Sequence, residues 1–217
     1  MTIHLQHELE GLKQRILSLA STVEETVQKG VRSLVEGDIA LAEEVVAGDE
    51  TIDALEVDLE EECLKILALH QPVAADLRFI IVVLKINNDL ERIADLAVNV
   101  AERTRGLAEV GRIPAPFDIA SMGRKVEVML EKSLDALVRL DRETALQVCA
   151  LDDEVDAQHK LTYTLVKTQI RQHAERLDAL VQYLSVSRHL ERIADLATNI
   201  AEDVLYMIEG EIVRHTV

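Results

Sequence analysis

Eight acidic side chains stand in four pairs, each pair with a spacing of four residues, and the pairs recur in matching places in the two halves of the chain. Residues at i and i+4 lie on the same face of an α-helix, and two carboxylates so placed repel each other by about 0.2–0.5 kcal/mol. A cation bound among them would relieve that repulsion, and oxygen ligands suit Mg, Mn, Ca or iron. The candidate ligands are Asp49, Asp53, Glu91, Asp95, Asp152, Asp156, Glu191 and Asp195.

One pair in each half lies within a thirteen-residue segment that occurs twice. Residues 90–102 read LERIADLAVNVAE and residues 190–202 read LERIADLATNIAE, so the two copies differ only at their ninth and eleventh positions. At about 100° per residue, the aliphatic residues of this segment share one arc of a helix, and the acidic residues lie on the opposite arc. The alanines of the buried arc are small and would let a neighbouring helix approach closely.

The acidic pairs of each half are expected to meet across one seam between two helices. If two helices fold back on each other, residues equidistant from the bend lie side by side. The midpoint between the pairs is Pro72 in the first half and falls between His173 and Ala174 in the second. The alternative is a solvated acidic strip without cations, held by Arg92 and Arg192.

Histidine and cysteine add little to the expected sites. His159 follows Asp156 by three residues, where the first half has Glu56, and we interpret it as a surface or hydrogen-bonded histidine rather than a ligand. We interpret His189 as structural. Cys63 and Cys149 have no metal-type spacing and are expected to be reduced. A Glu-x-x-His motif is absent from the pairs, so the ferritin-like di-iron pattern is not met.

The elements that must position these residues are helices. Glycine, proline and aromatic residues are scarce, and apolar residues recur at steps of three and four, which predicts an all-α fold. A second alignment, of residues 29–54 with 132–157, shows that the duplication covers a whole three-helix unit. The expected domains are a first repeat at 1–105, a linker at 106–117 and a second repeat at 118–217. The expected helices cover 5–35, a short turn at 39–47 ended by Gly48, 49–71, 72–105, a fourth helix capped by Asp118, 152–172 and 175–209.

The charge and the motifs exclude several classes of function. The formal net charge is −17, with 40 acidic and 23 basic residues, so direct binding to nucleic acid or to an anionic membrane is not expected. The longest apolar run is only residues 79–84, and the first residues do not form a signal peptide. No phosphate-binding loop or nucleophile motif is present, so we expect no enzyme. A metal-dependent phosphate-ester hydrolase and a helical scaffold without metal remain the alternatives.

The duplicated segment, with Asp-x-x-x-Asp upstream of it in both halves, closely resembles the PhoU family over about residues 5–210. Asp89 and His189 differ between the halves, and the C-terminal Arg-His-Thr-Val has no counterpart in the family. The resemblance implies two three-helix bundles related by a pseudo-twofold axis. It also implies multinuclear iron or zinc clusters on the eight acidic residues, although Mg or Mn would suit them as well.

The same resemblance implies the biological role. Members of this family are cytoplasmic negative regulators of the phosphate response. They act between the phosphate ABC transporter, with its ATPase subunit, and a sensor histidine kinase, and they are often homodimers. We therefore expect a cytoplasmic adaptor that restrains phosphate signalling and uptake when phosphate is plentiful.

Overall fold

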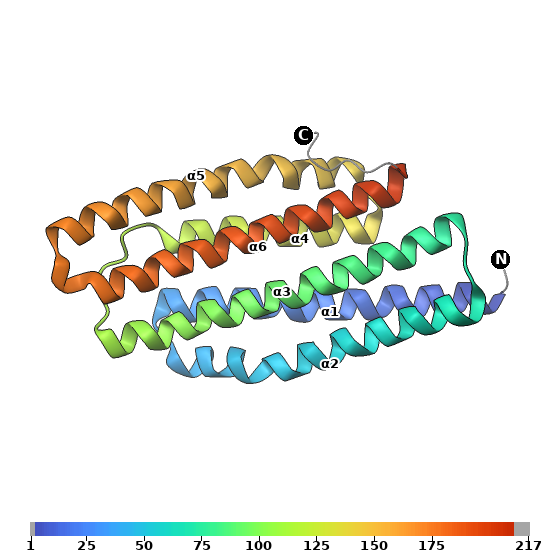
Figure 1. The fold of residues 1–217 in the computed structure, drawn as a ribbon, viewed down its shortest axis with the longest axis horizontal. Helices are drawn as coiled ribbons and strands as arrows, with labels where there is room; N and C mark the ends of the chain where they lie inside the picture. Colours follow the sequence, from blue (N-terminus) through green and yellow to red (C-terminus); the bar gives the residue numbers. More distant parts are fainter. Residues whose placement is uncertain (1–2, 211–217) are drawn as a thin grey trace.

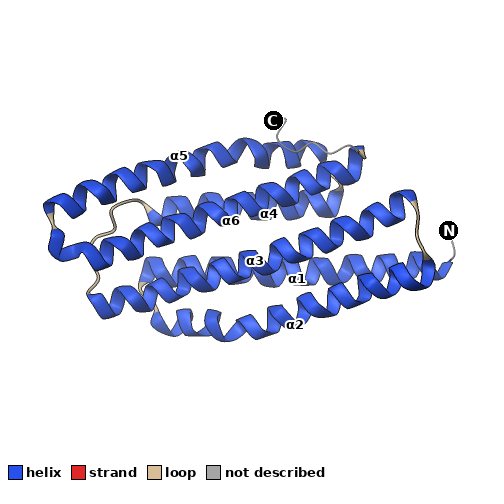
Figure 2. Cartoon of the chain, in the orientation of Figure 1, coloured by secondary structure: helices blue, strands red, loops and turns tan. Residues whose placement is uncertain are grey.

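The chain folds into six long α-helices arranged as two antiparallel sets of three (Figure 1). The computed structural model describes residues 3–210, and within them there is no strand (Figure 2). The expectations for the first two residues and for the C-terminal Arg-His-Thr-Val lie outside this range. The first set consists of α1 (Ile3–Glu36), α2 (Ile39–His70) and α3 (Ala74–Val110). The second set consists of α4 (Ile119–Arg139), α5 (Arg142–Gln172) and α6 (Leu177–Glu209), with a 3-10 turn η1 at Ala174–Arg176.

Helices α3 and α6 lie side by side and join the two sets (Figure 1). Together with α2 and α5 on their outer sides they form one layer, and α1 and α4 form the second layer behind it. The all-α prediction with two three-helix repeats is therefore confirmed. The predicted buried arc is also confirmed, because Leu90, Ile93 and Ala97 of α3 are at most 1% exposed. Their counterparts in α6 are buried as well, in one core cluster that extends through both sets.

Small residues set how closely the helices approach. A Cβ atom on Gly30 of α1 would lie 3.0 Å from the carbonyl oxygen of Ala97 in α3. A Cβ atom on Gly123 of α4 would overlap the side chain of Val31 in α1. Helix α1 therefore packs closely against α3 within its own set and against α4 of the other set.

Aspartates cap the helices where the sequence predicts new starts. The Asp38 carboxylate accepts from Leu41 N at 3.0 Å, and Asp118 accepts from Ser121 N at 2.9 Å. Each bond satisfies an amide that has no partner inside the helix. Gly210 ends α6 with a φ of 76°, as expected from the sequence.

Two predicted breaks in the helices are wrong. Gly48 does not end a short turn, because α2 continues through it with Val45 and Ile52 buried on either side. A glycine inside a helix costs only about 1 kcal/mol, which the burial of this stripe outweighs. The corresponding helix α5 likewise starts at Arg142 and not at Asp152.

The third helix also differs from the prediction at both ends. It begins at Ala74, so Pro72 lies in the turn before it instead of at its first position. It continues past residue 105, because Leu107 extends its buried stripe, and it ends at Val110 before Gly111, which has a φ of 88°. The segment between the two sets is therefore shorter than the expected linker.

The segment between α3 and α4 is hydrogen-bonded to one helix of each set. The Arg112 guanidinium donates to the carbonyl oxygens of Leu34 and Val35 at the end of α1, both at 2.7 Å. The buried Tyr183 of α6 donates its hydroxyl hydrogen to Ile113 O at 2.8 Å.

The described helices include none with the length and hydropathy needed to cross a membrane.

Candidate metal centre

The four acidic pairs lie on the layer formed by α2, α3, α6 and α5 (Figure 1). In each set, one pair comes from the second helix and one from the third, and these two helices are antiparallel neighbours. The bends lie at residues 71–73 and at His173 with η1, close to the midpoints that the sequence predicts. The two pairs of each set are therefore level with each other across one seam.

In the first set the structure brings the carboxylates into electrostatic contact. Burial, followed by repulsion from Asp53 and Asp95, raises the pKa of Asp49. Burial, followed by repulsion from Asp95, Glu56, Asp53 and Asp49, raises the pKa of Glu91. Asp49 and Glu91 are thus both repelled by Asp53 and Asp95, and Glu56 adds to the repulsion of Glu91.

In the second set three carboxylates come closest together. Oxygen atoms of Asp156, Glu191 and Asp195 all lie within 4.8 Å of one another. Asp152 completes the set: burial, followed by repulsion from Asp195 and Asp156, raises its pKa to about 6. Burial and the neighbouring carboxylates also raise the pKa of Asp195 and of Glu191.

Basic side chains offset only part of this negative charge. Lys160 Nζ lies 2.8 Å from an Asp156 carboxylate oxygen, and Arg192 favours the charged forms of Glu191 and Asp195. In the first set, however, Arg92 pairs with Asp89 at 3.7 Å instead of with an expected ligand. The expected role of Arg92 in holding the acidic strip is therefore not observed in the described residues.

The donor set suits a bound cation. Asp49 Oδ1 is buried and has no hydrogen-bond partner among the described residues, which is costly for a carboxylate oxygen unless something positive contacts it. The pKa values of the clustered carboxyls are raised because burial and neighbouring negative charges disfavour the ionised form. Cations placed between the pairs would reverse both effects, and carboxylate oxygens are the ligands that hard cations and iron accept.

Two supporting contacts were not predicted from the sequence. Asn87 of α3 is 1% exposed and donates its Nδ2 to Glu56 Oε1 at 3.0 Å. At the matching place in α6, the buried Ser187 Oγ lies 2.8 Å from His159 Nδ1. The repeat spacings pair Glu56 with His159 and Asn87 with Ser187, so a comparison of the two halves could have identified these contacts. His159 is hydrogen-bonded, as interpreted from the sequence.

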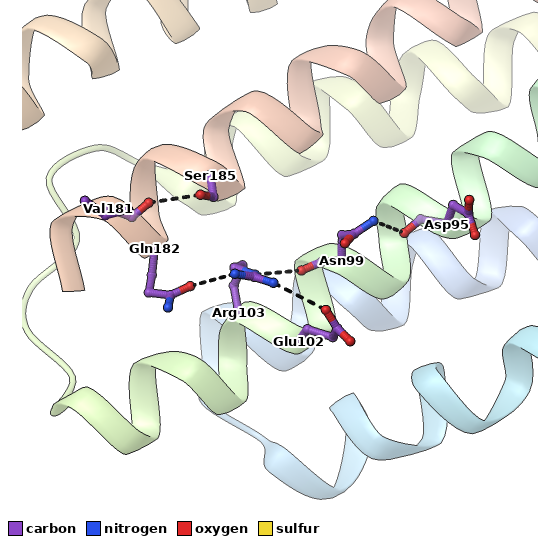
Figure 3. Close-up of polar contacts among 7 residues, drawn as sticks. All are labelled: Asp95, Asn99, Glu102, Arg103, Val181, Gln182 and Ser185. Atoms are coloured by element: carbon purple, nitrogen blue, oxygen red, sulfur yellow. Dashed lines mark hydrogen bonds and ion pairs between the residues drawn. The ribbon is translucent and has the colours of Figure 1, made fainter. Parts of the chain in front are cut away.

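Polar contacts also connect the two central helices near the clusters (Figure 3). Arg103 of α3 donates to Gln182 Oε1 of α6 at 3.1 Å and to Asn99 O of its own helix at 3.3 Å. Asn99 in turn donates to Asp95 O at 2.7 Å. The Arg103–Gln182 bond is the one that joins α3 to α6, whereas the bonds to Asn99 O and Asp95 O lie within α3.

Comparison with known proteins gives a consistent result along nearly the whole chain. A model of the PhoU domain family matches residues 16–104 and 119–204. A "phosphate-specific transport system accessory protein PhoU homolog" from Pseudomonas aeruginosa is 37% identical over 209 residues, which are 96% of this chain and 86% of the relative. A homolog of the same name from Aquifex aeolicus is 39% identical over 208 residues, or 96% and 94% of the two chains.

Solved structures agree with this similarity. The crystal structure of PhoU from Pseudomonas aeruginosa matches with a TM-score of 0.93 and 36% identity, covering 95% of this chain and 99% of that one. The structure of the phosphate transport system regulatory protein PhoU from Streptococcus pneumoniae matches with a TM-score of 0.85 and 30% identity, covering 96% and 99%.

Proposed function

The chain belongs to the PhoU family, and from this premise we propose that it is a regulatory accessory protein of a phosphate-specific transport system. The observation that carries the proposal is the match in both halves, at 30–39% identity, to relatives whose names state this role. The role is regulatory and not enzymatic, because the relatives are named as accessory proteins.

Within that role, the chain acts as an adaptor that restrains the phosphate starvation response. Its partners are the ATPase subunit of the phosphate ABC transporter and a sensor histidine kinase, which it meets in the cytoplasm as a homodimer. The acidic surface supports protein partners with basic faces and disfavours nucleic acid, since the net charge is −17.

In this proposal each acidic cluster holds a multinuclear metal centre. The family implies iron or zinc, and Mg or Mn would also suit the oxygen ligands. Asp49, Asp53, Glu91 and Asp95 would hold one centre; Asp152, Asp156, Glu191 and Asp195 would hold the other. The bound cations supply positive charge that removes the repulsion across each seam. The carboxylates then hold α2 against α3 and α5 against α6, which fixes the surface that the partners meet.

A reporter assay tests the adaptor role. In a bacterium that lacks its own PhoU protein, a phosphate-starvation promoter is active even in rich phosphate if restraint is lost, and expression of this chain is expected to silence it. A pull-down with the purified chain should capture the transporter ATPase subunit and the kinase. Persistent promoter activity with a well-expressed chain, together with no capture of either partner, would contradict the proposal.

The metal part is tested separately with charge-matched variants. Elemental analysis of protein purified without chelator is expected to find bound metal, and Asp53→Asn with Asp95→Asn should remove it from the first centre. The control is Glu50→Gln with Glu61→Gln, which removes two exposed charges from α2. Equal metal content in both variants would show that the first cluster is not a metal site.

A further inference from the structure

The two proposed centres differ at one position that the internal duplication makes directly comparable. On α2 this position is Glu56 and on α5 it is His159. Each side chain has a buried partner on the next helix, Asn87 for the glutamate and Ser187 for the histidine. An amide donor faces the carboxylate, whereas a hydroxyl faces the imidazole. The position and its support have therefore changed together.

The contacts of Ser187 involve one ring nitrogen of His159, the Nδ1 atom. The Ser187 hydroxyl donates to Met122 Sδ at 3.7 Å. A hydroxyl has one proton, so when Ser187 gives that proton to Met122 it accepts at its 2.8 Å contact with His159 Nδ1. The Nδ1 atom is then the N–H donor, and Nε2 keeps its lone pair. Histidine ligands are oriented in this way, with one nitrogen donating to a second group and the other facing the metal.

His159 is also placed beside the carboxylates. It lines one groove together with Glu191 and Asp195 of α6, and it stands three residues after Asp156 on the same helix face. Oxygens of those three acidic residues lie within 4.8 Å of one another. His159 is not a member of this group, so its imidazole borders the three carboxylates in the groove and would have to turn toward an ion held by them.

We propose that His159 is a nitrogen ligand of the second centre and that the two centres consequently prefer different metals. The first centre, with Glu56, offers oxygen atoms only and suits hard cations such as Mg²⁺ or Mn²⁺. The second centre, with an imidazole among its carboxylates, suits a borderline cation such as Zn²⁺. This inference rests on the metal binding proposed above, and it adds which ion each half of the protein takes.

Nitrogen NMR of the wild-type protein tests the ligand directly and needs no variant. Apo protein labelled with ¹⁵N is titrated with Zn²⁺, and the Nε2 resonance of His159 is expected to shift to the range of metal-bound nitrogen while Nδ1 stays protonated. His173, which contacts Glu175 at the end of α5, is the internal control and should not respond. Zinc bound in stoichiometric amount with His159 Nε2 unchanged would overturn the inference and leave the carboxylate centres standing.

Exchanging the paired residues between the halves tests the metal preference. Apo protein is equilibrated with equal Zn²⁺ and Mn²⁺, and both metals are measured after desalting. The variant His159→Glu with Ser187→Asn should lose the zinc-preferring centre, and Glu56→His with Asn87→Ser should gain a second one. Ser187→Ala should weaken zinc binding by about 10–100-fold.

Circular dichroism before the competition establishes that each variant is folded. A zinc-to-manganese ratio equal to that of the wild type in both folded exchange variants would overturn the inference. Absence of stoichiometric metal from the wild-type protein would overturn the inference together with the metal binding on which it rests.

Discussion

Replacing Asp152 by asparagine is expected to stabilise the metal-free protein at neutral pH. The pKa of this carboxyl is raised from 3.8 to about 6, first by burial and then by Asp195 and Asp156. A carboxyl with a higher pKa in the folded protein binds its proton more tightly there than in the unfolded chain. The free energy of unfolding therefore falls as the pH rises from about 4 to about 6, and the loss persists at higher pH.

The size of the effect follows from the pKa difference. Each pKa unit corresponds to about 1.4 kcal/mol, which would give about 3 kcal/mol for a fully buried group. Asp152 is only half-buried, and solvent screening reduces the effect to about 1–2 kcal/mol. For a chain of this length the corresponding rise in Tm is about 2–8 °C.

Thermal melts in EDTA at pH 7.5 and at pH 4 provide the assay. Asp152→Asn should raise the Tm at pH 7.5 and leave it unchanged at pH 4, where the wild-type carboxyl is already protonated. With metal bound the sign should reverse, because the variant then lacks a ligand. The control is Asp153→Asn, an exposed neighbour. An equal gain at both pH values, or a lower Tm in EDTA at pH 7.5, would refute the reasoning.

Three further perturbations test the packing and the cations. Tyr183→Phe removes the hydrogen bond to Ile113 O and should cost about 1 kcal/mol in urea unfolding. Gly123→Ala forces a methyl group against Val31 and should cost about 1–3 kcal/mol; Val31→Ala in the same chain should recover part of that loss. EDTA added to metal-loaded protein should lower the Tm by several degrees, and an unchanged Tm would mean that the ions do not hold the helices together.

Helix type and helix pairing could be predicted from the sequence, whereas several helix ends could not. Aliphatic periodicity identified the buried stripe of α3, and aspartate caps identified the starts of α2 and α4. The predicted helix end at Gly48 was wrong because a glycine destabilises a helix only slightly, and the buried residues Val45 and Ile52 on either side of it stabilise a continuous helix. Val45 is buried against Ala101 of α3, which is distant in sequence, so no local pattern reveals that burial.

The grouping of the carboxylates could be predicted because it needs only a periodicity and a bend. Two antiparallel helices place Asp49 beside Asp95 once the turn lies near residue 72. The same fold-back places Asn87 opposite Glu56 and Ser187 opposite His159. Their roles were not predicted, because both residues lie on the buried side of their helices and by type alone resemble core positions. Their polar atoms matter only because of the side chains opposite them.

The segment between α3 and α4 has a consequence for how the protein unfolds. Its Arg112 is bonded to the end of α1 and its Ile113 to Tyr183 of α6, and one core cluster extends through both sets. Neither set can lose its structure without removing contacts from the other. The duplicated halves should consequently melt together in a single cooperative transition, and cutting the chain between them should not release two independently stable fragments.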